Sequence, residues 1–367
     1  MDRRKFIKNG AKVLGAVGAV GATSISAPAI ASSEKKFKWK MTTAYPPSLP
    51  MYSVGPGSFT DLTDRIREMS GGRLDIQVYH GGELVPPFEG FDAAQAGIVE
   101  CNGWVSYFGA GKRPWAQFFG GVPFGLNFQG QNAWMYEGGG LELWQELYAD
   151  IGMVPFPCAN TGIQMTGWFK EEVNTLEDMK GLKMRIPGLA SRVYAAVGVD
   201  VKLLPPAEIF PALERGVIQA AEWVGPAQDK ILGLHNAAKY YYTTGWSEPN
   251  NVVEFSVNKK AWDSLPEDLQ HIVRNACAST NVRSQAWSEA VNGEALQDLV
   301  ENHGVQLRTL SDDILNGLRE AMPSVLEELG AGDPLFARVH DHYMDFKAKH
   351  DKWSDVSESQ WHRRIRG

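Results

Sequence analysis

Cysteine is scarce in this sequence of 367 residues, which has only Cys101, Cys158 and Cys277, far apart and without a CxxC pair. This spacing excludes a zinc ribbon and allows at most one disulfide, so we expect buried free thiols. Long apolar runs are scarce too. Beyond the first thirty residues the sequence has no run of 18 apolar residues without a charged one. This excludes a polytopic membrane protein.

An excess of basic residues is also absent, since 36 Lys and Arg face 43 Asp and Glu and the net charge is −7. Residues 1–31 carry five basic residues and one acidic residue, so their removal would lower the net charge by four, to −11. Nucleic acids and anionic membranes attract clustered Lys and Arg, so we expect no nucleic acid partner for this acidic chain. The apolar content of 44% is enough for a globular core.

The first 31 residues have the pattern of an export signal. A basic head with Arg3 and Arg4 precedes a short stretch of Gly, Ala and Val, and Ala29-Ile30-Ala31 offers the small residues that a signal peptidase needs. The arginine pair before a modestly apolar, glycine-rich stretch resembles a twin-arginine signal, and a general secretory signal is the alternative. Either signal predicts an exported protein.

Strand patterns alternate with helix patterns after this signal, which predicts an α/β fold. Residues 37–43 have the composition of a strand, and apolar residues recur at helical spacing over 58–69, with Met69 expected on the buried face. Apolar and polar residues then alternate over 74–78, as in a half-buried strand.

An internal repeat is the most informative feature of the chain. Residues 86–104 match residues 205–223 at an offset of 119, with seven identities in 19 positions, where chance gives about one. In each copy we expect a Pro-Pro pair to enter a helix, Gly97 or Gly216 to close it, and an apolar strand to follow. Two such units predict two similar lobes with a ligand cleft between them, unless only the local helix chemistry is repeated.

Two long helical patterns lie in the last third of the chain. The pattern over 266–303 is mostly uninterrupted and long enough to lie across both lobes. Asp333 and Pro334 then predict the start of a last helix, over 334–367. Its apolar stripe needs a partner surface, either its own lobe or a second subunit. The stripe consists of Phe336, Val339, Tyr343, Phe346 and Trp353.

Common enzyme motifs are missing, since the sequence has no GxSxG, HExxH, Walker loop or GxGxxG. Recognition residues are expected over 161–254 instead. Arg185 ends a predicted apolar strand, where an arginine suits the capture of a carboxylate, although a surface arginine on an edge strand is the alternative. Glu222 leaves another apolar strand and therefore needs an arginine or a metal ion. Gln164 adds a neutral oxygen that alkali and alkaline-earth ions accept as a ligand.

At these residues the chain resembles the extracytoplasmic solute receptors of TRAP transporters, which are tripartite ion-driven uptake systems. The resemblance is carried by Leu182-Lys-Met-Arg-Ile-Pro187, Glu208-Ile-Phe-x-Ala-Leu213-x-x-Gly216 and Trp262-x-x-Leu265-Pro266-x-x-Leu269. It implies a periplasmic receptor with the two-lobed periplasmic-binding-protein architecture, which delivers its ligand to membrane permease subunits. Arg185 matches the family arginine that pairs with the substrate carboxylate.

The expected boundaries follow from these patterns. Residues 37–157 with 247–265 are assigned to the first lobe, and residues 158–246 with part of 304–333 to the second. The lobe-spanning helix and the C-terminal helix complete the chain.

Two positions depart from the commonest dicarboxylate and sialic-acid pattern of this family, which has arginine where this chain has Gln164 and asparagine where it has Trp223. Both departures resemble the branch that binds 2-oxoacids and lactate, in which a metal ion bridges protein and substrate. The implied metal ligands are Gln164, Glu222, the Trp223 carbonyl and a later glutamate. We favour Glu248, in a loop before a proline, over Glu254 in an apolar strand, and sodium over calcium.

The implied substrate is a small 2-oxo or 2-hydroxy monocarboxylate such as pyruvate, because one arginine and one metal ion with two carboxylates are together about neutral. The substrate-binding residues are then Arg185, Gln164, Trp223 and Tyr107. For Trp104 and Tyr107 core packing is the alternative to an aromatic wall. An exported metal-assisted enzyme acting on a small carboxylic acid is the alternative function, and a homodimer through the C-terminal helix is expected.

Overall fold

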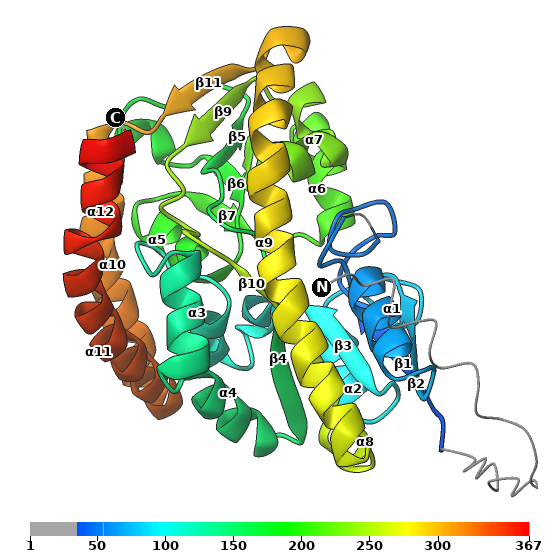
Figure 1. The fold of residues 1–367 in the computed structure, drawn as a ribbon. Helices are drawn as coiled ribbons and strands as arrows, with labels where there is room; N and C mark the ends of the chain where they lie inside the picture. The colour runs from blue at the N-terminus through cyan, green and yellow to red at the C-terminus, as the bar shows by residue number, and fades with distance from the viewer. Residues whose placement is uncertain (1–34, 54, 367) are drawn as a thin grey trace, which may run out of the picture. The chain divides into compact units, whose positions relative to one another are not determined.

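The computed structural model describes residues 35–53 and 55–366, so the export signal expected over 1–31 lies outside the described part of the chain. Residues Lys36–Gly367 form one unit. Two sheets with helices packed around them make up this unit, which confirms the α/β class (Figure 1).

The first sheet has five strands in the order β2, β1, β3, β10, β4. Strands β2, β1 and β3 are parallel, and β10 is antiparallel to both of its neighbours. Buried and exposed residues alternate at the start of β1 and β2, as the sequence predicts, whereas β10 is buried throughout. The strands are β1 (Phe37–Thr43), β2 (Leu74–Tyr79), β3 (Cys101–Trp104), β4 (Met153–Asn160) and β10 (Val252–Asn258).

The second sheet has six strands in the order β11, β9, β5, β8, β6, β7. Here β8, β6 and β7 are parallel, and β5 runs antiparallel to β8 and β9. The strands are β5 (Gly167–Phe169), β6 (Lys183–Arg185), β7 (Asp200–Lys202), β8 (Ala220–Ala221), β9 (Tyr240–Thr243) and β11 (Gln306–Thr309). Three parallel strands followed by one antiparallel strand therefore recur in the two sheets.

The internal repeat coincides with this recurrence, because its copies contain β3 and β8, which hold the same place in their sheets. The helices differ from the expectation in one respect. In the second copy Pro206 is the first residue of α6 (Pro206–Glu214), but in the first copy the proline pair lies in a turn and α2 (Gly90–Gln95) begins three residues later. Gly97 and Gly216 follow these helices with φ of +75° and +73°, a conformation that favours glycine.

The helices of the first part of the chain pack around these sheets. Ser58 caps α1 by accepting a hydrogen bond from the Asp61 backbone, and Leu62 and Ile66 are buried. The prediction for Met69 was wrong, since it is 52% exposed in the last turn before Gly71. These helices are α1 (Phe59–Met69), α3 (Phe128–Glu137), α4 (Gly140–Ala149), α5 (Gly188–Ala196), α7 (Pro226–Leu232) and α8 (Lys259–Asp263).

The long helix α9 (Glu267–His303) packs against β4, β10 and α1 near the first sheet and against α7 near the second. Figure 1 shows it in yellow and orange running past both sheets, as its sequence pattern predicts. Ser284, midway along it, accepts a hydrogen bond from the Asn160 backbone N–H at 2.8 Å and donates to the Asn160 carbonyl. This helix therefore links the two sheets along their common side.

Two further helices form the C-terminal hairpin, α10 (Asp312–Gly332) and α11 (Pro334–Val356), followed by α12 (Glu358–Trp361). Asp333 caps α11 as predicted. Phe336, Val339 and Tyr343 are fully buried against the chain's own helices, and the Tyr343 hydroxyl accepts from the Leu126 backbone at 2.8 Å. Trp353, at the end of the stripe, is 67% exposed. Most of the stripe therefore packs within its own chain.

Two expectations from composition concern the cysteines and the crossing of a membrane. All three cysteines are buried free thiols, as expected. Over residues 35–53 and 55–366, none of the helices combines the length and the apolar character that crossing a membrane requires.

Candidate functional site

Arg185 and Glu222 form a buried ion pair at the edge where β6 and β8 end. The two strands are parallel neighbours, so their carboxyl ends meet there. Arg185 Nη1 lies 3.1 Å from Glu222 Oε2 and donates to the Glu222 backbone oxygen at 2.7 Å. Arg185 Nε and Glu222 Oε1 are buried without a hydrogen-bond partner. Each group of the pair therefore keeps one atom for a further contact.

Glu248, in the loop before β10, brings a second carboxylate to this ion pair. Asn251 Nδ2 donates to Glu248 Oε2 at 2.8 Å and to the Tyr107 hydroxyl at 2.6 Å. Tyr107 belongs to the short helix η1 (Ser106–Gly109), which follows β3 of the first sheet. Asn251 thus joins an acidic group and an aromatic residue that are far apart in the sequence.

Gln164 lies in the segment that connects β4 to β5, beside Glu248. Its backbone N–H donates to the Glu248 carbonyl at 3.1 Å. Its side-chain Nε2 donates to Thr161 Oγ1 at 3.1 Å, which leaves the amide oxygen buried without a partner. Gln164 is therefore held on both sides while its oxygen is available to a cation or a donor.

A small cavity lies beside Arg185, Tyr107 and Asn251 and is lined by residues from the surroundings of both sheets. The Arg185 guanidinium carbon lies 5.6 Å from the centre of the Trp223 ring, and the edge of Tyr45 packs against that ring at 6.2 Å between centroids. The volume of about 20 Å³ accepts roughly one water molecule in this arrangement. The lining residues are Tyr45, Met51, Val105, Tyr107, Phe108, Thr161, Arg185, Trp223, Val224, Asn251 and Val253.

Burial controls the protonation of the two carboxyl groups. It raises the pKa of Glu222 well above the usual value, repulsion from Glu248 raises it further, and Arg185 opposes both effects. Burial also raises the pKa of Glu248 to about 8, against the stabilisation of its charged form by Arg185, Tyr107 and Asn251. Without a further positive charge, the site therefore favours uptake of a proton near neutral pH.

Glu254 and Trp104 lie apart from this cluster, inside the first sheet. Glu254 on β10 faces Trp104 on β3 in the strand register, and its Oε2 accepts from the Tyr148 hydroxyl at 3.1 Å. Trp104 stacks on Phe91 with 5.0 Å between ring centres. The geometry thus places Glu248 beside Arg185 and Glu222 but places Glu254 and Trp104 in the core, whereas Tyr107 lines the cavity.

The donor set suits an alkali or alkaline-earth ion. Glu222 Oε1 and Gln164 Oε1 are buried oxygens without a partner. No donor among the described residues bonds to the Trp223 carbonyl oxygen. Sodium and calcium accept such carboxylate, amide and backbone oxygens. Within the described residues no group of three or more His, Cys, Asp or Glu forms a metal cluster, so a set that is half neutral is the candidate here.

Sequence reasoning missed two residues of this site. Asn251 follows Glu248 by three residues in the same loop, so the run Glu248-Pro249-Asn250-Asn251 was a signal that a polar network gathers there. Tyr45 follows β1 and carries no local signal, because its contact with Trp223 joins residues distant in the chain. Such contacts depend on how the two sheets face each other.

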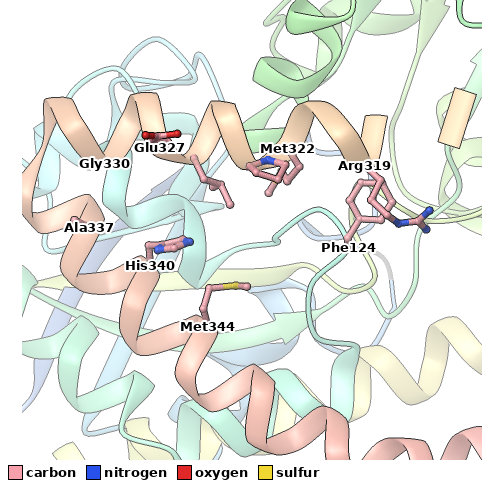
Figure 2. Close-up of a pocket in the computed structure, with 10 residues that line it drawn as sticks. Phe124, Arg319, Met322, Glu327, Gly330, Ala337, His340 and Met344 are labelled. Atoms are coloured by element: carbon pink, nitrogen blue, oxygen red, sulfur yellow. The ribbon is translucent and has the colours of Figure 1, made fainter. Parts of the chain in front are cut away.

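A second, larger hollow lies between α10 and α11, as Figure 2 shows. Met322 and Glu327 of α10 and His340 and Met344 of α11 face it, and Phe124 closes one end. Its volume is about 510 Å³ and its walls are mainly apolar. Its polar lining residues are Arg319, Glu327 and His340, and the rest of the lining is mostly apolar, so the hollow is an apolar groove.

Comparison with known proteins places these features in a family. The family model described as bacterial extracellular solute-binding protein, family 7 (DctP), matches residues 52–333. The monocarboxylate 2-oxoacid-binding periplasmic protein of Nostoc sp. (strain PCC 7120) is 40% identical over 358 residues, which cover 98% of this chain and 97% of that protein.

Solved structures agree with this assignment. A TRAP transporter solute-binding protein from Bordetella bronchiseptica, a mixed-occupancy dimer with calcium and picolinate, is 35% identical and has a TM-score of 0.86, covering 90% of this chain and 97% of that chain. A TRAP periplasmic solute-binding protein from Pseudoalteromonas atlantica with sodium and pyruvate is 37% identical, with a TM-score of 0.85 and coverage of 90% and 100%. The two-lobed α/β fold expected from the sequence is confirmed, and the chain belongs to the DctP family of bacterial extracellular solute-binding proteins.

Proposed function

We propose that this protein is the periplasmic receptor of a TRAP transporter and that it captures a small 2-oxo or 2-hydroxy monocarboxylate together with a metal ion. The observation that carries the proposal is the arrangement at Arg185. Its Nη1 pairs with Glu222, its Nε is buried without a hydrogen-bond partner, and Arg185 itself lines the small cavity. A guanidinium with one edge free suits a planar carboxylate.

Membership of the family supports this assignment over an exported metal-assisted enzyme. The relative from Nostoc is named for 2-oxoacids, and the two solved relatives hold pyruvate or picolinate with a metal. In both compounds the carbon next to the carboxylate is bonded to an atom whose lone pair can bind a metal ion, the keto oxygen of pyruvate or the ring nitrogen of picolinate. Incubation of the protein with pyruvate should leave the pyruvate signals unchanged by NMR, and a new product would favour the enzyme.

Different residues would bind the ligand carboxylate and the metal ion. Arg185 binds the ligand carboxylate, and Trp223 and Tyr107 limit its position within the cavity. Gln164, Glu222, Glu248 and the Trp223 carbonyl would hold the ion, which supplies a positive charge to the 2-oxo or 2-hydroxy oxygen. We propose sodium over calcium because calcium affinity rises with the number of carboxylates, and half of these donors are neutral.

The charge count also sets selectivity. With one arginine at the site, the second carboxylate of succinate or malate would be desolvated without a partner. We therefore expect C3 to C6 2-oxo or 2-hydroxy monocarboxylates to bind at least tenfold more tightly than succinate in titration calorimetry. Tighter binding of the dicarboxylate would contradict the proposal.

Metal dependence is tested with the same assay after exhaustive dialysis. Removal of the ion should weaken pyruvate binding, and titration with sodium or with calcium identifies which ion restores it at lower concentration. Unchanged affinity in buffer shown by elemental analysis to be free of both ions would mean that Arg185 and hydrogen bonds hold the ligand without a metal.

We also propose a homodimer through the C-terminal segment. The end of the chain exposes four apolar residues, Trp353, Val356, Trp361 and Ile365. Three arginines lie in the same segment, at 363, 364 and 366. The helix α10, which borders the groove of Figure 2, carries exposed acidic residues. The solved Bordetella relative is a dimer. Deleting residues 357–367 should shift the mass measured by light scattering from dimer to monomer, and a full-length monomer at micromolar concentration would refute the interface.

A further inference from the structure

Asp229 is a buried acid that the proposed function has not used. It lies in the first turn of α7, five residues after Val224, which lines the cavity, and it is fully buried. A buried carboxylate is costly unless hydrogen bonds satisfy it. Its partners therefore show what it is needed for.

Three donors converge on this carboxylate. Asp229 Oδ1 accepts from the Val224 backbone N–H at 2.9 Å. Oδ2 accepts from Trp168 Nε1 at 2.9 Å and from the Tyr241 hydroxyl at 2.8 Å. Trp168 and Tyr241 stack on each other in the second sheet, with 4.0 Å between ring centres. Two of the donors, Trp168 and Tyr241, belong to the core of the second sheet. The third donor is the backbone of Val224, which lines the cavity.

The hydrogen bond from the Val224 N–H to Asp229 also fixes the orientation of the Trp223 carbonyl. The N–H of Val224 and the carbonyl of Trp223 belong to one planar peptide unit, and no cis peptide occurs in the described chain. In a trans unit the N–H and C=O groups point in opposite directions. Because the Val224 N–H points toward Asp229, the Trp223 carbonyl of the same peptide unit points away from Asp229.

The neighbouring peptide is held as well. The Val224 carbonyl accepts from the Met165 backbone N–H at 2.9 Å, and the adjacent Gln164 N–H bonds to the Glu248 carbonyl. One chain of backbone hydrogen bonds therefore connects Asp229 to the segments that supply Gln164, Glu248 and the Trp223 carbonyl. Of these, the Trp223 carbonyl oxygen has no donor among the residues that the structure describes.

We propose that Asp229 is a positioning residue for metal binding, which orients and polarises the Trp223 carbonyl through the Val224 N–H. The inference rests on the proposed function, because it assumes the ion expected beside Glu222. Donation of an N–H to a carboxylate increases the electron density on the oxygen of the same amide, which makes that oxygen a better ligand. Asp229 itself does not touch the ion.

The test compares Asp229→Asn with Trp168→Phe and Tyr241→Phe. The asparagine keeps the shape but loses the charge and one acceptor, so the Val224 bond weakens. The two controls remove one core donor each and leave the Val224 bond in place. We expect Asp229→Asn to raise the dissociation constant for sodium or calcium about tenfold or more, the usual effect of losing a group that supports a metal ligand.

Thermal unfolding in metal-free buffer supplies the readout for a purely structural role. The controls should lower the melting temperature while their metal affinity stays within about twofold of the wild type. In Asp229→Asn the loss of pyruvate affinity should be recovered at saturating metal. Equal metal affinity in Asp229→Asn and wild type, or an equal loss in all three variants, would overturn the inference.

Hydrogen exchange on the wild-type chain decides the matter should Asp229→Asn fail to fold. The Val224 amide should be protected in metal-free protein, and rapid exchange there would refute the bond to Asp229. The two proposals fail differently. A wild type that binds pyruvate equally well without metal refutes the metal site, whereas a metal-dependent wild type with an unaffected Asp229→Asn variant refutes only the role of Asp229.

Discussion

Trp104 and Trp223 end the two copies of the internal repeat, and the residues before them differ in kind. Glu222 precedes Trp223 and faces Arg185, whereas Gly103 precedes Trp104. A Cβ atom at Gly103 would lie 2.3 Å from the Met41 side chain, so the first copy has no room for a carboxylate there. The same strand position thus packs the core in one lobe and carries charge in the other.

An arginine from outside the repeat lies near the tryptophan of each copy. The Arg113 guanidinium carbon lies 4.0 Å from the centre of the Phe91 ring and 5.9 Å from that of Trp104. Arg113 Nη1 lies 3.9 Å from Asp92 Oδ1. Arg185 lies 5.6 Å from Trp223 and pairs with Glu222. Both arginines have a buried Nε without a partner, but Arg185 lines the small cavity, whereas Arg113 lies over the Phe91 ring. A repeated scaffold therefore does not imply repeated chemistry, which depends on the groups beside each strand end.

The largest expected effect separates the two arginines. Arg185→Ala should weaken binding of the 2-oxo monocarboxylate by about 3 to 5 kcal/mol, because it removes one partner of a desolvated charge pair. Titration calorimetry measures the loss. Arg113→Ala is the matched control, and it should lower the melting temperature while leaving the affinity within about threefold. Near-normal affinity in Arg185→Ala would move the ligand carboxylate elsewhere.

The next effect distinguishes the buried Glu254 from Glu222 by the pH dependence of the free energy of unfolding. Burial raises the pKa of Glu254 to about 7, so the folded chain keeps this proton while the unfolded chain releases it near pH 4.5. The group's contribution to the free energy of unfolding is therefore present below about pH 4.5 and is lost as pH rises to about 7, by up to about 3 kcal/mol.

Glu254→Gln removes this titration and still accepts from Tyr148. Its free energy of unfolding, measured by denaturant titration at pH 5 and pH 8, should fall less with rising pH than that of the wild type. Its ligand affinity should be unchanged, in contrast to that of Glu222→Gln. Parallel stability curves for Glu254→Gln and wild type would show that Glu254 is already ionised when folded.

The smallest effect concerns the glycine of the first copy. Gly103→Ala should destabilise the fold by about 1 to 2 kcal/mol, because the added methyl group overlaps Met41 and the Phe59 ring, which must shift. Thermal unfolding measures this change, and the ligand affinity serves as the control. An unchanged melting temperature would mean that the core of the first lobe has space for a side chain at this position.

Local patterns predicted the parts of the site that local chemistry determines. Arg185 and Glu222 could be found because each leaves an apolar strand, and parallel strands bring such residues to one edge. Strands, the long helix and the cap at Asp333 follow from periodicity and capping in the same way. The start of α2 could not be predicted, because Pro87 lies in a turn whereas the matching Pro206 is the first residue of a helix.

Contacts between distant segments were beyond the sequence alone. Glu248 and Glu254 are both buried acids near one strand, and only the pairing of β10 with β3 separates the core position from the cavity. Tyr45 carries no local signal, since Trp223 is distant in the chain, and the Trp168 donor of Asp229 is likewise 61 residues away. Resemblance to a family supplied the full set of proposed metal ligands, which periodicity alone would not have supplied.

The helix α9 has a mechanical consequence for ligand entry. It is a single element of 37 residues, about 55 Å long, without proline and with Gly293 as its one glycine. It packs against β4 near the first sheet and against α7 near the second. Any movement that separates these two elements must therefore either change one of the two packing surfaces or bend α9. The free energy of that change would add to the cost of admitting a ligand larger than water.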